Sequence, residues 1–300
     1  MINLINFSTH LQQKGIIPKT IARHEREVTK YENWLQDNHN KNAENTTQKE
    51  LLNYLQHIKE KRSLQNVSLS KILRILKNYH QYLTKNYNTK NITAHLKIRG
   101  TNRKHIYPLF TTDELDLLCD AYYYYTQEYK PTTKEIRFYP NYDKLLQGRY
   151  IALTLMAYQG LQTKEILTLT KANFDLRKAT IKINAGITGT ARTLKLEASQ
   201  IGIIIQHFTT EETCIIPNLN QLEKLSKTLK KLTLKPSTNI TQFKNFRQLR
   251  ASKITHWIKL YGLRKAQHLA GHKNIQGTEN YLINDVENLQ NDLNNFHPLN

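Results

Sequence analysis

Hydrophobic positions in residues 1–96 recur at three- and four-residue steps, the pattern of amphipathic helices. Residues 4–13 form the first such stretch, and Pro18 opens a second, longer one. Thr47 precedes a third stretch as its N-cap, and a fourth follows Ser63. We therefore expect a four-helix domain over residues 1–96.

Residues 97–110 lose this periodicity and gather charged and turn-forming residues. Thr111 and Glu114 then form a capping box that starts a new helix. We therefore expect an exposed basic linker over 97–110 and a second domain over 111–300.

The pattern in the second domain changes several times. Residues 122–144 follow no single period, and no element is assigned to them. Residues 149–160 form an apolar helix, and alternation within 179–196 predicts a β-hairpin. Two further helices end at Gly262 and Gly271. The expected fold class is mainly α with a small antiparallel sheet.

Composition adds a strong positive charge to this picture. Lys and Arg number 44 against 24 Asp and Glu, which gives a formal net charge of +20. Such a chain favours a polyanionic partner, and nucleic acid is the first candidate. A solvated lysine-rich surface would give the same charge, so charge alone leaves the partner open. The function therefore has to be inferred from motifs.

Several other classes of protein are disfavoured. No apolar run has the length of a membrane-spanning helix, and the N-terminus lacks a signal-peptide pattern, so we expect a cytoplasmic protein. Only Cys119 and Cys214 are present, without a zinc-ligand spacing. We expect neither a disulfide framework nor a metal site.

Candidate phosphate-binding cations occur in both domains and in the linker. On the fourth helix they lie largely outside the apolar stripe, and in the linker we expect them to be exposed. They are Lys71, Arg74, Lys77, Arg99, Arg103, Lys104 and Arg192. The alternative for these cations is a solvated surface role.

The four consecutive tyrosines Tyr122–Tyr125 could stack on nucleic-acid bases, and the alternative for them is packing inside the protein.

Four motifs make the chain resemble the tyrosine recombinases of the phage integrase family. The run "HLQQKGIIPKTIARHEREVTKYENWL" of this chain resembles the opening of the family's core-binding domain. "PLFTTDEL" resembles the start of its catalytic domain. "YQGLQTKEILTLT" and "RQLRASKITHWI" are similar to its two arginine boxes. "LAGHKNIQGTENYL" sets His272 and Tyr281 nine positions apart, as the family does for its last histidine and its nucleophile.

This resemblance implies a fold and an activity. It implies an N-terminal core-binding domain and a catalytic domain that clamp double-stranded DNA, with a homo-oligomer on DNA or a partner recombinase. Tyr281 would be the nucleophile, Arg250 the second arginine and His272 the last histidine. Residues 284–300 would dock on a neighbouring protomer. The family's chemistry needs no cofactor and no metal.

The chain departs from the family at three catalytic positions. Gln162 stands where the first arginine belongs, and Arg247 replaces the usual histidine. The turn 185–190, where the family keeps a lysine, has none. Arg247 is a candidate to replace the lost charge, and Lys182 or Lys195 to replace the lost acid. The catalytic set is degenerate, and whether it cleaves DNA stays open.

The residue types fit the chemistry that the resemblance implies. A tyrosine has a pKa near 10 and must lose its proton to attack phosphorus, and the transition state gathers charge on oxygens. Arginine binds two such oxygens through its planar fork. Thr278 is expected to cap a short helix that carries Tyr281 in its first turns.

Three hypotheses remain at this point. They are an active site-specific recombinase, an impaired relative that binds DNA as an accessory or regulatory factor, and an unrelated nucleic-acid-binding protein such as an RNA binder.

Overall fold

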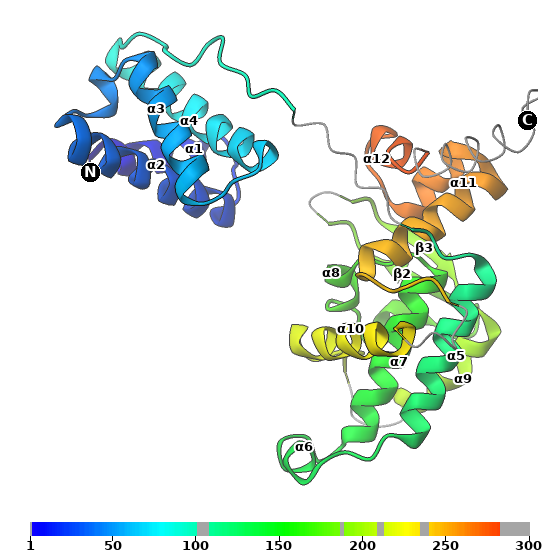
Figure 1. Ribbon diagram of the computed structural model, residues 1–300. Helices are drawn as coiled ribbons and strands as arrows, with labels where there is room; N and C mark the ends of the chain where they lie inside the picture. Colours follow the sequence, from blue (N-terminus) through cyan, green and yellow to red (C-terminus); the bar gives the residue numbers. More distant parts are fainter. Residues whose placement is uncertain (1, 101–107, 187–188, 209–212, 235–239, 283–300) are drawn as a thin grey trace, which may run out of the picture. The chain divides into compact units, whose positions relative to one another are not determined.

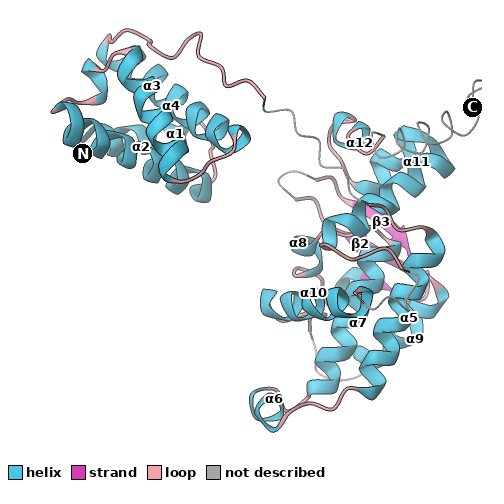
Figure 2. Ribbon diagram, in the orientation of Figure 1, coloured by secondary structure: helices cyan, strands magenta, loops and turns pink. Residues whose placement is uncertain are grey.

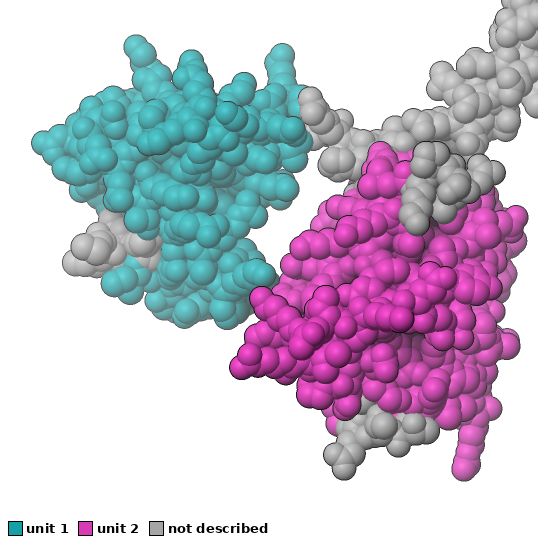
Figure 3. All heavy atoms as spheres, turned by 60° about the horizontal axis from the view of Figure 1, so that its bottom comes forward, with its two compact units in different colours: residues 1–105 teal, residues 106–300 magenta. Residues whose placement is uncertain are grey.

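The computed structural model describes residues 2–100, 108–186, 189–208, 213–234 and 240–282 (Figure 1). The chain divides into two compact units, residues 1–105 and 106–300, coloured separately in Figure 3. Each unit is described by itself. Within the described ranges, no helix is both long and apolar enough to cross a bilayer.

Unit 1 consists of four α-helices, as the sequence predicts. They are α1 (Ile2–Gln13), α2 (Pro18–His39), α3 (Gln48–Lys61) and α4 (Asn66–Tyr87), with the 3-10 turn η1 (Ala43–Asn45) before α3. Thr47 caps α3, because its hydroxyl accepts a hydrogen bond from the Glu50 backbone N–H. Their apolar stripes meet in one core that includes Phe7, Tyr31 and Leu76.

Unit 2 begins with three helices, α5 (Thr112–Glu128), α6 (Thr133–Phe138) and α7 (Tyr142–Tyr158). The segment 122–144, left unassigned above, is therefore mostly helical. No single period fits it because α5 ends, α6 begins and ends, and α7 begins among these residues, and α6 has no buried residue. The phenols of Tyr129 and Tyr142 both donate to the carboxylate of Glu135, at 2.8 and 2.9 Å, and join α6 to its neighbours.

The small sheet has three antiparallel strands in the order β1 (Phe174–Asp175), β2 (Thr180–Ile183) and β3 (Arg192–Lys195) (Figure 2). The predicted hairpin is confirmed, with Ile183 opposite Arg192. The other elements of this part of the chain are α8 (Thr163–Ile166), η2 (Lys171–Asn173), α9 (Ala198–His207) and α10 (Leu219–Thr233).

Helix α11 (Phe246–Ala270) carries the last long apolar pattern. Gly262 interrupts it with φ 76° and ψ 170°, so the two predicted helices are the two halves of one kinked helix. Gly271 ends α11 in the left-handed region at φ 68°, and α12 (Gln276–Glu279) follows. The mainly helical class with a small antiparallel sheet is confirmed.

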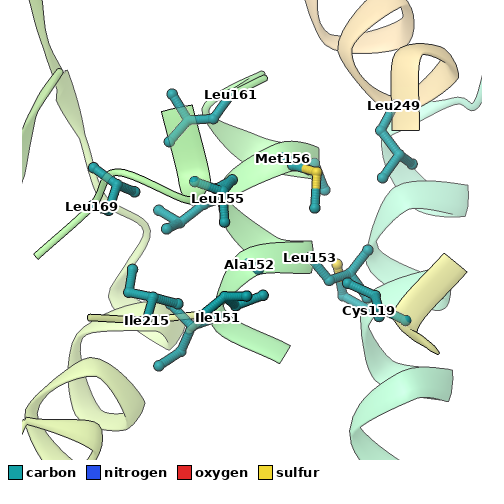
Figure 4. Close-up of a cluster of buried hydrophobic side chains, with 14 of the residues drawn as sticks. Cys119, Ile151, Ala152, Leu153, Leu155, Met156, Leu161, Leu169, Ile215 and Leu249 are labelled. Atoms are coloured by element: carbon teal, nitrogen blue, oxygen red, sulfur yellow. The ribbon is translucent and has the colours of Figure 1, made fainter. Parts of the chain in front are cut away.

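The core of unit 2 forms around α7. Ile151 and Leu155 lie on one face of this helix and Leu153 on another, all three are fully buried, and Leu249 of α11 belongs to the same cluster (Figure 4). A helix that is apolar on all sides is surrounded by protein. The core therefore fixes α11, and with it the segment that ends at Gly271.

Because each unit has a core of its own, we expect their stabilities to respond separately. Leu76→Ala should destabilise unit 1 by about 2 to 5 kcal/mol, through lost burial and a residual cavity. Hydrogen exchange followed by mass spectrometry should locate the lost protection in unit 1. Leu155→Ala is the matched variant for unit 2, and loss of protection in both units from either change would contradict this expectation.

Candidate active site

Arg250 lies at the centre of a polar cluster beside the core of unit 2. It is 5% exposed on α11, and its Nη1 donates to the Gly160 carbonyl at 2.5 Å. Nη2 donates to the Ala270 carbonyl at 2.7 Å and meets His272 Nε2 at 3.1 Å. One guanidinium therefore joins the turn after α7 to the last residue of α11 and to His272, which follows the Gly271 cap.

The contacts of His272 define its protonation state. A guanidinium N–H can only donate, so Nε2 must accept, and the proton of the neutral ring lies on Nδ1. Nδ1 then donates to the Thr278 hydroxyl at 2.8 Å. Burial, followed by the charges of Arg250 and Arg192, lowers the pKa of His272 to about 4. The ring is therefore neutral at pH 7.

Tyr281 lies against this histidine. The two rings are stacked, with centroids 5.9 Å apart and an interplanar angle of 8°. Burial lowers the pKa of Arg250, and the nearby phenol of Tyr281 opposes that shift. The guanidinium stays charged, since arginine titrates far above neutral pH. Tyr281, Arg250 and His272 are thus brought together.

The expected position of Tyr281 in a helix is wrong. Thr278 is a buried residue inside α12 rather than its N-cap, and Tyr281 follows the end of that helix. The Tyr281 backbone N–H donates to the Thr278 carbonyl at 2.9 Å. The Thr278 hydroxyl bonds to His272 rather than to a backbone N–H of α12. Thr278 therefore positions the histidine.

A second buried arginine supports the same turn. Arg192 is 4% exposed on β3, and its fork forms two bonds of 2.9 and 3.0 Å with the carboxylate of Glu165. Glu165 also accepts from the Gln162 backbone N–H at 2.8 Å. A Cβ on Gly271 would lie 2.5 Å from Arg192 Nη1, so glycine is needed there. The hairpin, α8 and the end of α11 are thereby held together.

The β2–β3 hairpin also reaches the histidine through its backbone. The Thr190 N–H donates to the Gly271 carbonyl at 3.0 Å, and Gly189 pairs with His272 in an antiparallel bridge. Figure 1 shows β3 beside α11 and α12. The turn in which the family carries a lysine is therefore adjacent to the cluster, and residues 187–188 of that turn lie outside the described ranges.

Gln162 borders the cluster, two residues after Gly160 and bonded through its backbone to Glu165, whereas the other suggested replacements form no hydrogen bond with the described residues of the cluster. Gln162 is the N-cap residue of α8 and carries no charge. Arg247 is exposed, and its side chain has no hydrogen bond or ion pair with any described residue of the cluster. Lys182 and Lys195 are exposed on the sheet face opposite the buried Ile183 and Arg192, because strand residues alternate.

The candidate phosphate-binding cations differ in accessibility. Lys71, Arg74 and Arg99 are exposed and Lys77 is half-buried, whereas Arg103 and Lys104 lie outside the described residues. Arg192 is wrong as a phosphate contact, because its side chain is buried in the pair with Glu165. Its charge is neutralised inside the protein and is not available at the surface.

Sequence reasoning missed two residues of the cluster, Glu165 and Thr278. Glu165 stands three positions after the α8 cap, the spacing of a capping box, so a local signal existed. Nothing in the sequence marks Thr278 as the partner of His272. Among the described residues, no group of three or more His, Cys, Asp or Glu is placed to hold a metal ion.

The arrangement suits chemistry on an anion. A phenol lies beside a fixed guanidinium and an imidazole, and the cation can stabilise negative charge that develops during attack by the phenol. Among the residues that the structure describes, no carboxylate bonds directly to Arg250, and Glu165 binds Arg192 instead.

Two family models match the chain. "Phage integrase, N-terminal SAM-like domain" matches residues 4–86, and "Phage integrase family" matches residues 132–288. No curated protein matches the sequence.

Solved structures are similar over nearly the whole chain. One is the XerH site-specific recombinase bound to a palindromic difH substrate, with a TM-score of 0.67 and 15% identity over 95% of this chain and 83% of that one. Another is the Tn1549 transposon integrase in complex with circular intermediate DNA, with a TM-score of 0.65 and 12% identity over 93% of this chain and 94% of that one. A third is a lambda integrase dimer bound to a COC′ core site, with a TM-score of 0.61 and 16% identity over 93% of this chain and 75% of that one. At these identities the likeness shows the fold.

The Glu165–Arg192 pair makes a testable contribution to stability. Glu165→Gln should destabilise unit 2 by about 3 to 5 kcal/mol, because it leaves a buried guanidinium without its counter-charge. Burial opposes ionisation of Glu165, but its bonds with Arg192 prevail and lower its pKa. The contribution is therefore complete above the unfolded pKa of about 4.3 and is lost as pH falls through the lower folded value.

Chemical denaturation between pH 7 and pH 3 measures this effect. Asp175→Asn is the matched control, because Asp175 pairs with Lys178 on the exposed surface and should matter by less than about 1 kcal/mol. Equal stability of Glu165→Gln and the wild type at pH 7 would show that the buried pair has no such role.

Proposed function

The chain belongs to the phage integrase family of tyrosine recombinases, and we propose that it is a site-specific DNA recombinase with Tyr281 as its nucleophile. The observation that carries the proposal is the convergence of Tyr281, Arg250 and His272 on one buried cluster. A phenol, a guanidinium and an imidazole side by side are the nucleophile, the cation and the proton-transfer group that this reaction needs.

The proposed reaction follows from the groups present. The Tyr281 oxygen attacks a backbone phosphorus of duplex DNA, forms a 3′-phosphotyrosyl bond and releases the 5′ oxygen, which takes up a proton. Attack by another 5′ hydroxyl reverses the step and frees the phenol. Because the ester bond is conserved, the exchange requires no external energy source.

Arg250 is the cation that meets the charge on the non-bridging oxygens. In the free protein three of its five N–H groups are bonded to Gly160, Ala270 and His272, and a phosphate oxygen that bonds to Nη2 has to displace the His272 contact. Release of Nε2 from Arg250 would allow His272 to act toward the phosphate. Binding of the anion and rearrangement of this hydrogen bond are then coupled.

Gln162 sets the expected limit on the rate. Removal of one well-placed donor to an anionic transition state costs about a hundred- to a thousand-fold in rate. Gln162 can donate a hydrogen bond without charge, and residues 185–190 supply no lysine as an acid. We therefore propose slow strand cleavage.

Affinity for DNA would come in part from cations of unit 1. The exposed Lys71 and Arg74 lie on one face of α4, three positions apart, and are proposed to contact phosphates with Lys77 and Arg99. The solved lambda integrase is a dimer on its core site, which supports a proposal that this chain also assembles on DNA or with a partner recombinase.

A second candidate function is DNA binding without cleavage, as an accessory or regulatory factor. The neutral Gln162 and the lysine-free turn favour it, because both remove groups that serve the chemical step and neither is needed for binding.

A trapping assay separates these two functions. A nicked suicide duplex prevents religation, so an active protein should accumulate as a covalent adduct that resists denaturation. A pool of nicked duplexes with random sequence serves as the probe. Gln162→Arg should raise the rate of adduct formation by about a hundred-fold or more, and Tyr281→Phe should abolish the adduct while DNA binding persists.

Tyr124→Phe is the matched control, since Tyr124 is an exposed tyrosine away from the cluster. No adduct from either the wild type or Gln162→Arg, with binding intact, would favour the accessory function over the recombinase.

The proposed DNA contacts predict a salt dependence. The logarithm of the affinity for a random duplex should fall linearly with the logarithm of salt concentration. Lys71→Gln and Arg74→Gln should each reduce the slope by about one. Lys49→Gln, an exposed lysine on α3, is the control. Unchanged slopes in the two α4 variants, or tighter binding to RNA, would count against this DNA interface.

A further inference from the structure

Helix α5 is acidic, although the protein as a whole is strongly basic. The helix contains no Lys or Arg, whereas the whole chain has a formal net charge of +20. Its carboxylates are Asp113, Glu114, Asp116, Asp120 and Glu128. A negative surface repels DNA phosphates, so the exposed face of α5 suits a basic partner rather than DNA.

The second half of α5 lines a groove of about 870 Å³, together with residues of α7 and α9. Tyr123, Tyr124 and Tyr150 lie in this groove with the carboxylates of Asp120 and Asp143. Tyr124 is 66% exposed, and the rings of Tyr123 and Tyr150 contact each other with centroids 5.4 Å apart. Phenol rings beside carboxylates attract cationic and aromatic side chains.

The groove has a net negative charge at neutral pH. Its lining includes Lys144 besides the two carboxylates, and the Lys144 ammonium donates to the Gln206 carbonyl at 2.9 Å. Burial, followed by the neighbouring Cys119 and Asp120, raises the pKa of Tyr150 to about 12, so this phenol keeps its proton. The same interaction indicates that the Asp120 carboxylate lies near the Tyr150 ring.

Helix α6 presents the opposite kind of surface. None of its residues is buried, and Ile136 and Phe138 are 49% and 67% exposed. Lys134 and Arg137 are exposed on the same short helix. Its carboxylate, Glu135, accepts hydrogen bonds from two phenols at 2.8 and 2.9 Å. The free surface of α6 is therefore apolar and basic.

The groove and α6 are neighbours on unit 2. Tyr129 lines the groove and donates to Glu135 of α6 at 2.8 Å. Figure 1 shows α6 at the opposite end of unit 2 from α12, which precedes Tyr281. The combined surface is therefore remote from the candidate active site.

We propose that two copies of this chain pair through this surface in the absence of DNA, with α6 of each copy in the groove of the other. Phe138 packs on the tyrosine rings, and Arg137 pairs with Asp120 of the second copy. Because the groove and α6 lie side by side, a two-fold axis forms each contact twice. A second copy is the occupant because its α6 supplies the aromatic and cationic groups that complement the groove, and such groups are enriched at the centres of protein interfaces.

The mass of the full-length protein in solution, measured without DNA by sedimentation equilibrium, tests the pairing. The mass should rise from 35.3 kDa toward twice that value as the concentration increases from about 1 to about 100 μM. Phe138→Ser should weaken the dimer at least about tenfold. Leu260→Ser is the matched control, because Leu260 is an exposed apolar residue of α11, and it should leave the dimer unchanged.

A charge exchange tests the pairing of Arg137 with Asp120. Arg137→Asp and Asp120→Arg should each weaken self-association, because each places like charges opposite each other. A mixture of the two variants should form a heterodimer about as tightly as the wild type, because both ion pairs are then restored. Circular dichroism checks that both variants fold.

A wild type that stays monomeric up to about 100 μM would overturn the proposal. So would a Phe138→Ser variant that dimerises as the wild type does, or a mixture of the charge variants that stays monomeric. Since no DNA is present and Tyr281 is unchanged, these results are distinct from a failure of the recombinase proposal.

Discussion

The buried guanidinium of Arg250 holds together parts of unit 2 that are far apart in the sequence. It bonds to Gly160, to Ala270 and to His272, and the phenol of Tyr281 lies near it. Carbonyl dipoles replace the water that a charged group loses on burial, which makes the buried charge tolerable. The same bonds place the histidine and the tyrosine where a phosphate could meet all three groups.

This arrangement depends on a second buried cation being neutralised separately. Arg192 is paired with Glu165, so the carboxylate reduces the net charge of the cluster without contacting Arg250 directly. Gly271 has no side chain and leaves room for Arg192 beside the turn. The structure thus separates a cation that supports the turn from one that is near the phenol, a distinction that residue type alone does not reveal.

The sequence predicted those features that local patterns encode. Helical periods gave the four helices of unit 1, strand alternation gave the β2–β3 hairpin, and the nine-residue spacing identified His272 and Tyr281. Features set by distant contacts were missed. Arg192 was expected at DNA because its partner Glu165 is 27 residues away in the sequence. Residues 122–144 follow no single period for a local reason, because parts of three helices, α5, α6 and α7, fall within them.

Arg250 fixes His272 as a neutral ring before any DNA is bound. Nitrogen-15 NMR of the His272 ring in the free, full-length protein, between pH 8 and pH 4, measures this most directly. We expect a neutral ring with its proton on Nδ1 down to pH 6 and a pKa of about 4. Titration near the ordinary value of about 6.5, or a neutral ring with its proton on Nε2, would contradict it.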